Sequence, residues 1–76
     1  MTAVEIEYCV PCGYLNRAED VQHVILSNFG EQLDAVTLRT GDHGVFTVSV
    51  DDETVFDKSQ DEYDVDEIAR LVRTRL

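Results

Sequence analysis

The sequence predicts an α/β fold, a two-layer sandwich in which two helices cover one face of a four-stranded mixed sheet. Short segments of alternating apolar and polar residues are typical of strands with one buried face. Two longer segments carry apolar residues at helical spacing. Their order along the 76 residues is strand, helix, three strands and helix. A chain of this length has room for one small core, so we expect a single domain over residues 1–76.

The first strand is predicted by Val4, Ile6 and Tyr8, which alternate with two glutamates. This polar alternate face implies that both helices pack on the opposite side of the sheet. A turn is expected at residues 9–13, which contain the only proline. A strand–helix–strand unit then favours a parallel pair of strands with a right-handed crossover.

The first helix is predicted by one apolar stripe, made up of Tyr14, Ala18, Val21, Ile25 and Phe29. Gly30 follows at a position where a helix C-terminal cap favours positive φ. The other strands are expected at residues 33–39, 45–50 and 53–57, with a loop at 40–44 and a tight turn at Asp51-Asp52.

A second helix is predicted to begin after Asp64. This residue has the side chain of an N-cap, and Glu67 stands three residues on, as in a capping box. The apolar stripe of this helix consists of Val65, Ile68, Val72 and Leu76.

The charge is strongly negative, with sixteen acidic residues against six basic ones and a net charge of −10. Such a chain repels phosphate backbones, so we expect no binding to nucleic acid. Lys58 is the only lysine. A dispersed acidic surface with so little lysine favours a halophilic protein, because concentrated salt screens the self-repulsion.

The segments that direct a protein to a membrane or out of the cell are not visible. There is no basic stretch followed by an apolar core, as in a signal peptide, and no apolar run approaches the roughly 20 residues of a membrane span. Two cysteines are also too few for a secreted disulfide scaffold. We expect a cytoplasmic monomer that binds no membrane.

Cys9 and Cys12 form a Cys-x-x-Cys motif between the first predicted strand and the first predicted helix. Free N–H groups and the positive end of the helix dipole favour thiolate there, and lower a cysteine pKa from about 8.5 into the range of roughly 3.5–7.5. The thiolate is the nucleophile of disulfide exchange, and a second thiol three residues away can release the product. Pro11 restricts the turn between the two sulfurs. These residues predict a thiol–disulfide redox site that needs no cofactor.

Three other interpretations of the motif stay open. The cysteines would be half of a metal site if His23 and His43 supplied the remaining ligands, although zinc modules usually place their second ligand pair close together, and we expect no metal. The pair would alternatively be a static disulfide, or a vestigial motif on a binding domain. A related possibility is a non-catalytic interaction module whose cysteine pair acts as a redox switch for partner binding.

The residues beside the cysteines are candidates for binding a substrate or a partner. Tyr8 and Tyr14 flank the motif and would shield the sulfurs or present a platform, although core packing is expected for at least one of them. Pro11 and Gly13 would shape the turn between them. The partners expected from this chemistry are proteins or low-molecular-weight thiols and disulfides.

The chain resembles the selenoprotein W-like (Rdx) family. The resemblance rests on the run from Tyr8 to Tyr14 (YCVPCGY) after an alternating strand, on Thr40-Gly41 and Gly44-Val45-Phe46, and on the run from Val55 to Lys58 (VFDK). It implies a thioredoxin-like β-α-β-β-β-α fold and redox activity at Cys9 and Cys12. The basic loop after the fourth strand of that family is reduced here to Lys58.

The identity of the attacking sulfur stays open at this point. Thioredoxin-like sites usually expose the first cysteine, which favours Cys9. The resembled family carries selenocysteine at the second position, which favours Cys12, and we prefer Cys12 as attacker with Cys9 as resolver. Thioredoxins also place a cis-proline opposite the cysteine pair. Here residues 40–44 must occupy that place, and their glycines would allow close backbone approach.

Overall fold

The computed structural model describes residues 2–76. Its elements are β1 (Ala3–Cys9), α1 (Leu15–Phe29), a 3-10 turn (Gly30–Gln32), β2 (Ala35–Gly41), β3 (Phe46–Val50), β4 (Glu53–Asp57) and α2 (Val65–Arg73). This order confirms the expected β-α-β-β-β-α arrangement and matches a thioredoxin-like α/β fold.

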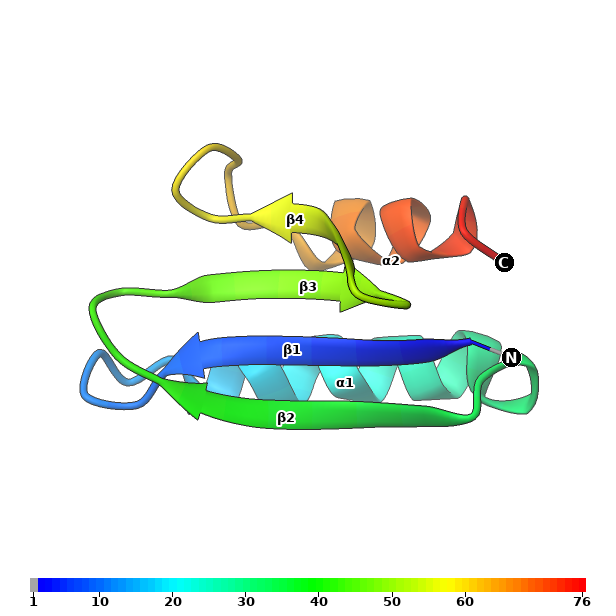
Figure 1. Cartoon of the computed structure of the whole chain (residues 1–76), viewed down its shortest axis with the longest axis horizontal. Coiled ribbons are helices and arrows are strands. Elements are labelled where there is room, and N and C mark those ends of the chain that lie inside the picture. Colours follow the sequence, from blue (N-terminus) through cyan, green and yellow to red (C-terminus); the bar gives the residue numbers. More distant parts are fainter. Residues whose placement is uncertain (1) are drawn as a thin grey trace.

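The four strands form one mixed sheet in the spatial order β2-β1-β3-β4. β1 pairs in parallel with β2 along its whole length, from Ala3 opposite Ala35 to Cys9 opposite Gly41. Its other edge pairs antiparallel with β3, and β3 pairs antiparallel with β4. β1 is therefore a central strand, and its carboxyl end carries the cysteine motif (Figure 1).

Both helices lie behind the sheet in Figure 1, with α1 behind β1 and β2, and α2 behind β4. The core between the two layers takes side chains from both helices and from three strands. Its buried members are Val4, Ile6, Tyr8, Ala18, Val21, Ile25, Phe46, Val48, Val50, Phe56, Ile68 and Val72. This set confirms the alternation in the first strand and the middle of the first helical stripe, whereas Tyr14 and Phe29 at its two ends are half-buried and pack against the core.

The β3–β4 hairpin turns at Asp51 and Asp52, which adopt φ angles of 51° and 69°. Two successive residues with positive φ are typical of the hairpin turns whose twist suits antiparallel strands, and aspartate tolerates this conformation. The Asp51 carboxylate also accepts a hydrogen bond from the Ala3 backbone N–H at 3.0 Å, which ties the turn to the start of β1.

The structure corrects two expectations about α1 and β2. Gly30 has a φ of −53°, not a positive value, because the chain continues into a 3-10 turn instead of reversing in a left-handed cap. β2 begins at Ala35 and extends through Thr40 and Gly41, which were expected in a loop. Pairing with the seven residues of β1 extends the strand beyond what its local composition indicates.

The second helix begins as expected but ends differently. Asp64 is its N-cap, and its carboxylate accepts hydrogen bonds from the N–H groups of Asp66 and Glu67 at 3.0 and 3.2 Å. The Glu67 side chain pairs with Arg70 instead of completing a capping box. Leu76 was expected on the buried stripe, but it lies beyond the end of the helix and is 39% exposed.

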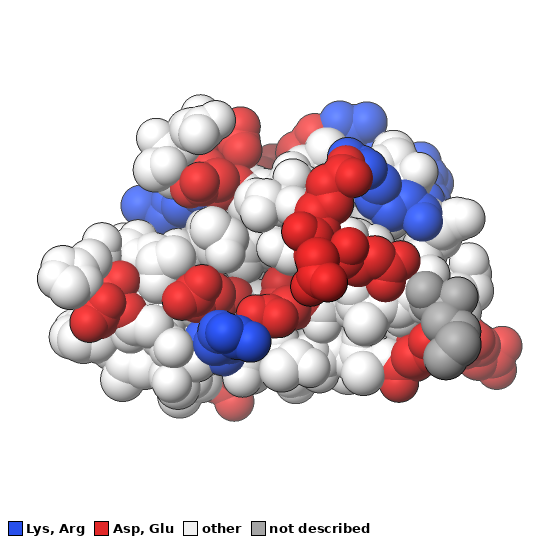
Figure 2. Space-filling view, viewed as in Figure 1, with Lys and Arg blue, Asp and Glu red and all other residues white. Residues whose placement is uncertain are grey.

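The face of the sheet that the helices leave open is polar. Figure 2 shows this face, with carboxylate side chains gathered across it. Glu5 lies there because it alternates with the buried Val4 and Ile6, and it forms an ion pair of 2.7 Å with Arg39. Within residues 2–76, no helix combines the length and the apolar character that a membrane span requires.

Candidate functional site

The candidate site lies at the carboxyl end of β1, where backbone hydrogen bonds hold the first cysteine. The Cys9 N–H donates to the Val45 carbonyl at 2.8 Å, and the Val10 N–H donates to the Gly41 carbonyl at 3.1 Å. The two bonds come from the segments on either side of β1. They place Cys9 in the sheet as the last residue of its strand.

After Cys9 the chain makes a tight turn into α1. The Gly13 N–H donates to the Val10 carbonyl at 3.1 Å, and the Tyr14 N–H donates to the Cys9 carbonyl at 3.3 Å. Gly13 has a φ of 76°, which an L-residue with a side chain rarely adopts. The turn brings the Cα atoms of Cys9 and Cys12 to 5.3 Å, within the range of disulfides, and the two residues form a disulfide.

The two cysteines differ in exposure. Cys9 is 0% exposed, whereas Cys12 lies exposed on the turn. The turn expected at residues 9–13 therefore does not include Cys9, which is the buried last residue of β1. The reason is its pairing with Gly41 and Val45, which makes it part of the sheet instead of part of the turn.

The start of α1 is electrostatically different from the start of α2. Tyr14 is the N-cap of α1 and makes no side-chain cap hydrogen bond, and the first turn contains no acidic residue. α2, in contrast, has the Asp64 cap and two acidic residues in its first turn. Helix N-termini attract negative charge through free N–H groups and the helix dipole. The exposed Cys12 thus lies beside an N-terminus that no carboxylate of its first turn neutralises.

An aromatic cluster supports this end of α1. The half-buried Tyr14 contacts Phe46 edge to face, with ring centroids 6.0 Å apart, and Phe46 makes a similar contact with Tyr63 at 5.7 Å. The Arg17 guanidinium lies 5.2 Å from the Tyr14 ring centroid and 5.0 Å from that of Tyr63. The Lys58 ammonium lies 5.5 Å from the Tyr14 ring centroid. Two cations therefore lie around the ring of Tyr14, which comes two residues after Cys12.

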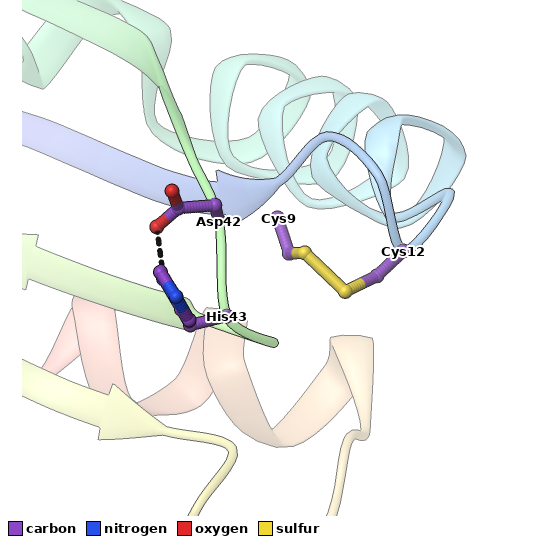
Figure 3. The surroundings of a disulfide bond; sticks show 4 residues. All are labelled: Cys9, Cys12, Asp42 and His43. Carbon is purple, nitrogen blue, oxygen red and sulfur yellow. Dashed lines mark hydrogen bonds and ion pairs between the residues drawn. A yellow bond between two sulfur atoms is a disulfide. The ribbon is translucent and has the colours of Figure 1, made fainter.

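The loop after β2 lies beside Cys9, as Figure 3 shows. His43 has a φ of 58°, and its Nδ1 lies 2.6 Å from a carboxylate oxygen of Asp42. Gly41 leaves room for the Val45 side chain, because a Cβ at this position would lie 2.8 Å from Cγ1 of Val45. No cis peptide bond occurs in residues 2–76, so this loop holds the cysteine strand without a cis-proline.

The other predicted site residues have different surroundings. Tyr8 is 8% exposed and belongs to the core, in line with the core packing expected for at least one of the two tyrosines, whereas Pro11 is exposed on the turn. His23 lies exposed on α1, and the structure does not bring it to the cysteines. Within residues 2–76, no three His, Cys, Asp or Glu side chains are grouped so that they could hold a metal ion.

Three residues of this site were not among the sequence candidates: Arg17, Lys58 and Tyr63. Arg17 lies in the first turn of α1, five residues after Cys12, so its closeness to the motif could have been inferred from the sequence. Tyr63 is far from the motif along the chain, and only the packing of its ring on Phe46 places it there. Burial raises the pKa of Tyr63 above its usual value, and the charge of Asp20 adds to this effect. Tyr63 therefore stays a neutral phenol at physiological pH.

Comparisons with known proteins agree with this geometry. A crystal structure of a protein from Bordetella parapertussis matches with a TM-score of 0.91 at 28% sequence identity, and the match covers 99% of this chain and 98% of that chain. The crystal structure of a selenoprotein W-related protein from Vibrio cholerae matches with a TM-score of 0.89 at 21% identity, covering 96% and 94%. A search among curated proteins found no significant match. The family model described as Rdx family matches residues 3–74, and the chain therefore belongs to the Rdx family.

Proposed function

We propose that this protein is a thiol–disulfide redox protein in which Cys12 attacks and Cys9 resolves. The observation that carries the proposal is the difference in exposure between the two sulfurs. A disulfide substrate can approach the exposed Cys12, whereas Cys9 is 0% exposed at the end of β1. Membership of the Rdx family supports a redox role for the pair.

The proposed reaction has two steps. The Cys12 thiolate attacks one sulfur of a substrate disulfide, forms a mixed disulfide and releases the other half as a thiolate, which takes up a proton. The Cys9 thiolate, formed when its thiol loses a proton, then attacks the Cys12 sulfur. This step closes the Cys9–Cys12 disulfide and releases the second thiol. The protein loses two electrons, the substrate gains them, and two molecules of a low-molecular-weight thiol return the protein to the dithiol.

The turn geometry supports the second step. The Cα atoms of the two cysteines lie 5.3 Å apart, so Cys9 reaches the Cys12 sulfur without a large backbone movement. The uncapped start of α1 supports the first step, because it favours the thiolate form of Cys12 over the thiol. The substrates of this chemistry are low-molecular-weight or protein disulfides.

Turnover of a model disulfide tests the proposal. The protein is mixed with bis(2-hydroxyethyl) disulfide and an excess of a monothiol, and the rate of thiol–disulfide exchange is compared with the rate without protein. We expect acceleration by the wild type and none by Cys12→Ser. A Cys12→Ser variant as active as the wild type would refute the assigned role, and a wild type without acceleration would refute the redox function.

A redox switch for partner binding is the second candidate function. Two apolar side chains are exposed at the motif: Val10, between the two cysteines, is 51% exposed, and Leu15, three residues after Cys12, is 46% exposed. Such residues beside a disulfide favour a protein contact that responds to its oxidation. A protein without turnover that binds a partner more tightly in one redox state than in the other would support this function instead.

A further inference from the structure

Of the six basic side chains of this protein, all within the described residues 2–76, three form ion pairs with glutamates, two lie against aromatic rings at the cysteine motif, and Arg73 does neither. Three of them pair with glutamates: Arg39 with Glu5, Arg70 with Glu67, and Arg75 with Glu53. Within residues 2–76, Arg17 and Lys58 form no ion pair, and both lie against aromatic rings next to the cysteine motif. Although the chain has sixteen acidic residues, these two cations at the proposed redox site pair with none of them, so both are free to bind an external anion.

The aromatic rings position these two cations without neutralising them. Arg17 lies over the rings of Tyr14 and Tyr63, and Lys58 lies over the ring of Tyr14. A guanidinium stacked on a ring keeps its N–H edge free for carboxylate oxygens, and an ammonium keeps donors that face away from the ring. Asp20 and Asp64 act on Tyr63 through their charge. Neither of them is among the ion pairs of residues 2–76, so neither pairs with Arg17.

We infer that Arg17 and Lys58 form an anion subsite beside Cys12, which selects disulfide substrates that carry carboxylates. This inference rests on the proposed redox function and adds the substrate class. Tyr14, whose N–H donates to the Cys9 carbonyl, connects the subsite to the turn, since both cations lie within 5.5 Å of its ring centroid. A carboxylate bound there would place its disulfide near the exposed Cys12.

The positive charge of the subsite is opposite to the net negative charge of the molecule. A net charge of −10 repels an anionic substrate over long distances and attracts a cationic one. At about 1 M salt the screening length falls to about 3 Å, so the long-range repulsion is lost while pairs in direct contact remain. The preference for carboxylates is therefore expected to be clearest in concentrated salt.

Three disulfides of different charge test this inference. The reduced protein is mixed separately with 3,3′-dithiodipropionate, bis(2-hydroxyethyl) disulfide and cystamine, which are anionic, neutral and cationic. The rate of Cys9–Cys12 disulfide formation is measured in about 1 M KCl. The readout is the ratio of the anionic to the neutral rate, because a general change in thiol reactivity or in stability cancels in that ratio.

The variants are Arg17→Gln, Lys58→Gln and, as the matched control, Arg73→Gln. Arg73 is the remaining basic residue without an ion pair in residues 2–76. It is the last residue of α2 and lines the same hollow as Asn28 and Phe29, at the end of α1 away from the cysteines. All three changes alter the net charge equally. We expect Arg17→Gln and Lys58→Gln each to lower the anionic-to-neutral ratio roughly 1.5- to 5-fold, as for an exposed charge pair, and Arg73→Gln to leave it unchanged.

The outcomes separate this inference from the proposed function. If all three disulfides oxidise the wild type and no variant changes the anionic-to-neutral rate ratio, the subsite is refuted and the redox function stands. An equal fall in all three variants would assign the effect to net charge and also refute the subsite. A wild type that none of the three disulfides oxidises would refute the redox function and this inference together.

Discussion

Phe46 supports three aromatic rings under the cysteine turn, and we expect its replacement by leucine to destabilise the protein more than the same change at Phe56. Both residues are 1% exposed, so the two changes remove equal volume from equally buried positions. Phe46 contacts Tyr14, Phe56 and Tyr63 edge to face, with centroids 6.0, 6.2 and 5.7 Å apart. Phe56→Leu removes only the contact between the two phenylalanines.

The magnitude follows from the two additional contacts. Each edge-to-face pair contributes about 0.5–1.5 kcal/mol beyond burial, so Phe46→Leu should lower the free energy of unfolding by about 1–3 kcal/mol more than Phe56→Leu does. Urea unfolding followed by circular dichroism, in the same molar KCl for all proteins, gives both losses. Equal losses for the two variants, or a larger loss for Phe56→Leu, would refute the role assigned to the aromatic cluster.

The α2 cap, the acidic surface and the Asp57 turn give three further expectations. Asp64→Ala should lower the free energy of unfolding by about 1 kcal/mol and the melting temperature by about 4–8 °C. Asp64→Asn keeps a hydrogen-bond acceptor and should lower both by less. Equal losses in the two variants would contradict the N-cap role of Asp64. We propose adaptation to concentrated salt, so the melting temperature should rise from low to molar KCl, and a flat or falling trend would count against it. The Ser59 hydroxyl and N–H donate to the Asp57 carboxylate and hold its pKa below the usual value, a stabilisation present at neutral pH and lost as the pH falls below about 4. In Ser59→Ala, the free energy of unfolding measured in urea should therefore fall less as the pH is lowered through this range. An unchanged pH dependence would contradict the role of Ser59.

The sequence predicted the layers of this fold because their signals are local. The alternation of Val4, Ile6 and Tyr8 and the stripe through Ala18 and Val21 each depend on one face of one element, and all five side chains are buried in the core. These patterns also predicted the order of elements and the helical start beside the cysteines. The layers and the order of the elements needed no information from distant parts of the chain.

The errors arise where long-range pairing or the continuing chain decides the conformation. Gly41 has the local character of a loop residue, but its place opposite Cys9 makes it the last residue of β2. The same pairing draws Cys9 out of the turn and into the sheet, which gives the two sulfurs different exposures. A glycine directly after a helix usually adopts a positive φ, and this was expected of Gly30. The 3-10 turn that begins at Gly30 continues the chain without a left-handed residue, so no positive φ is needed.

Half of the site was also beyond local prediction. The motif and its position before a helix predicted the two cysteines, but Lys58 and Tyr63 reach Tyr14 and Arg17 only through the folded chain. Lys58 stood out as the only lysine, and nothing local indicated that its ammonium would lie over an aromatic ring at the redox site.

The assignment of Cys12 as attacker and Cys9 as resolver is tested by comparing how fast the two single-cysteine variants attack a disulfide. Cys9→Ser keeps the exposed Cys12, and Cys12→Ser keeps the buried Cys9. Both are incubated with bis(2-hydroxyethyl) disulfide at neutral pH, in salt at which circular dichroism shows each to be folded, and the mixed disulfide is followed by mass spectrometry. We expect rapid mixed-disulfide formation by Cys9→Ser and slow formation by Cys12→Ser. Faster reaction of Cys12→Ser, or reaction of both variants no faster than free cysteine, would contradict this assignment.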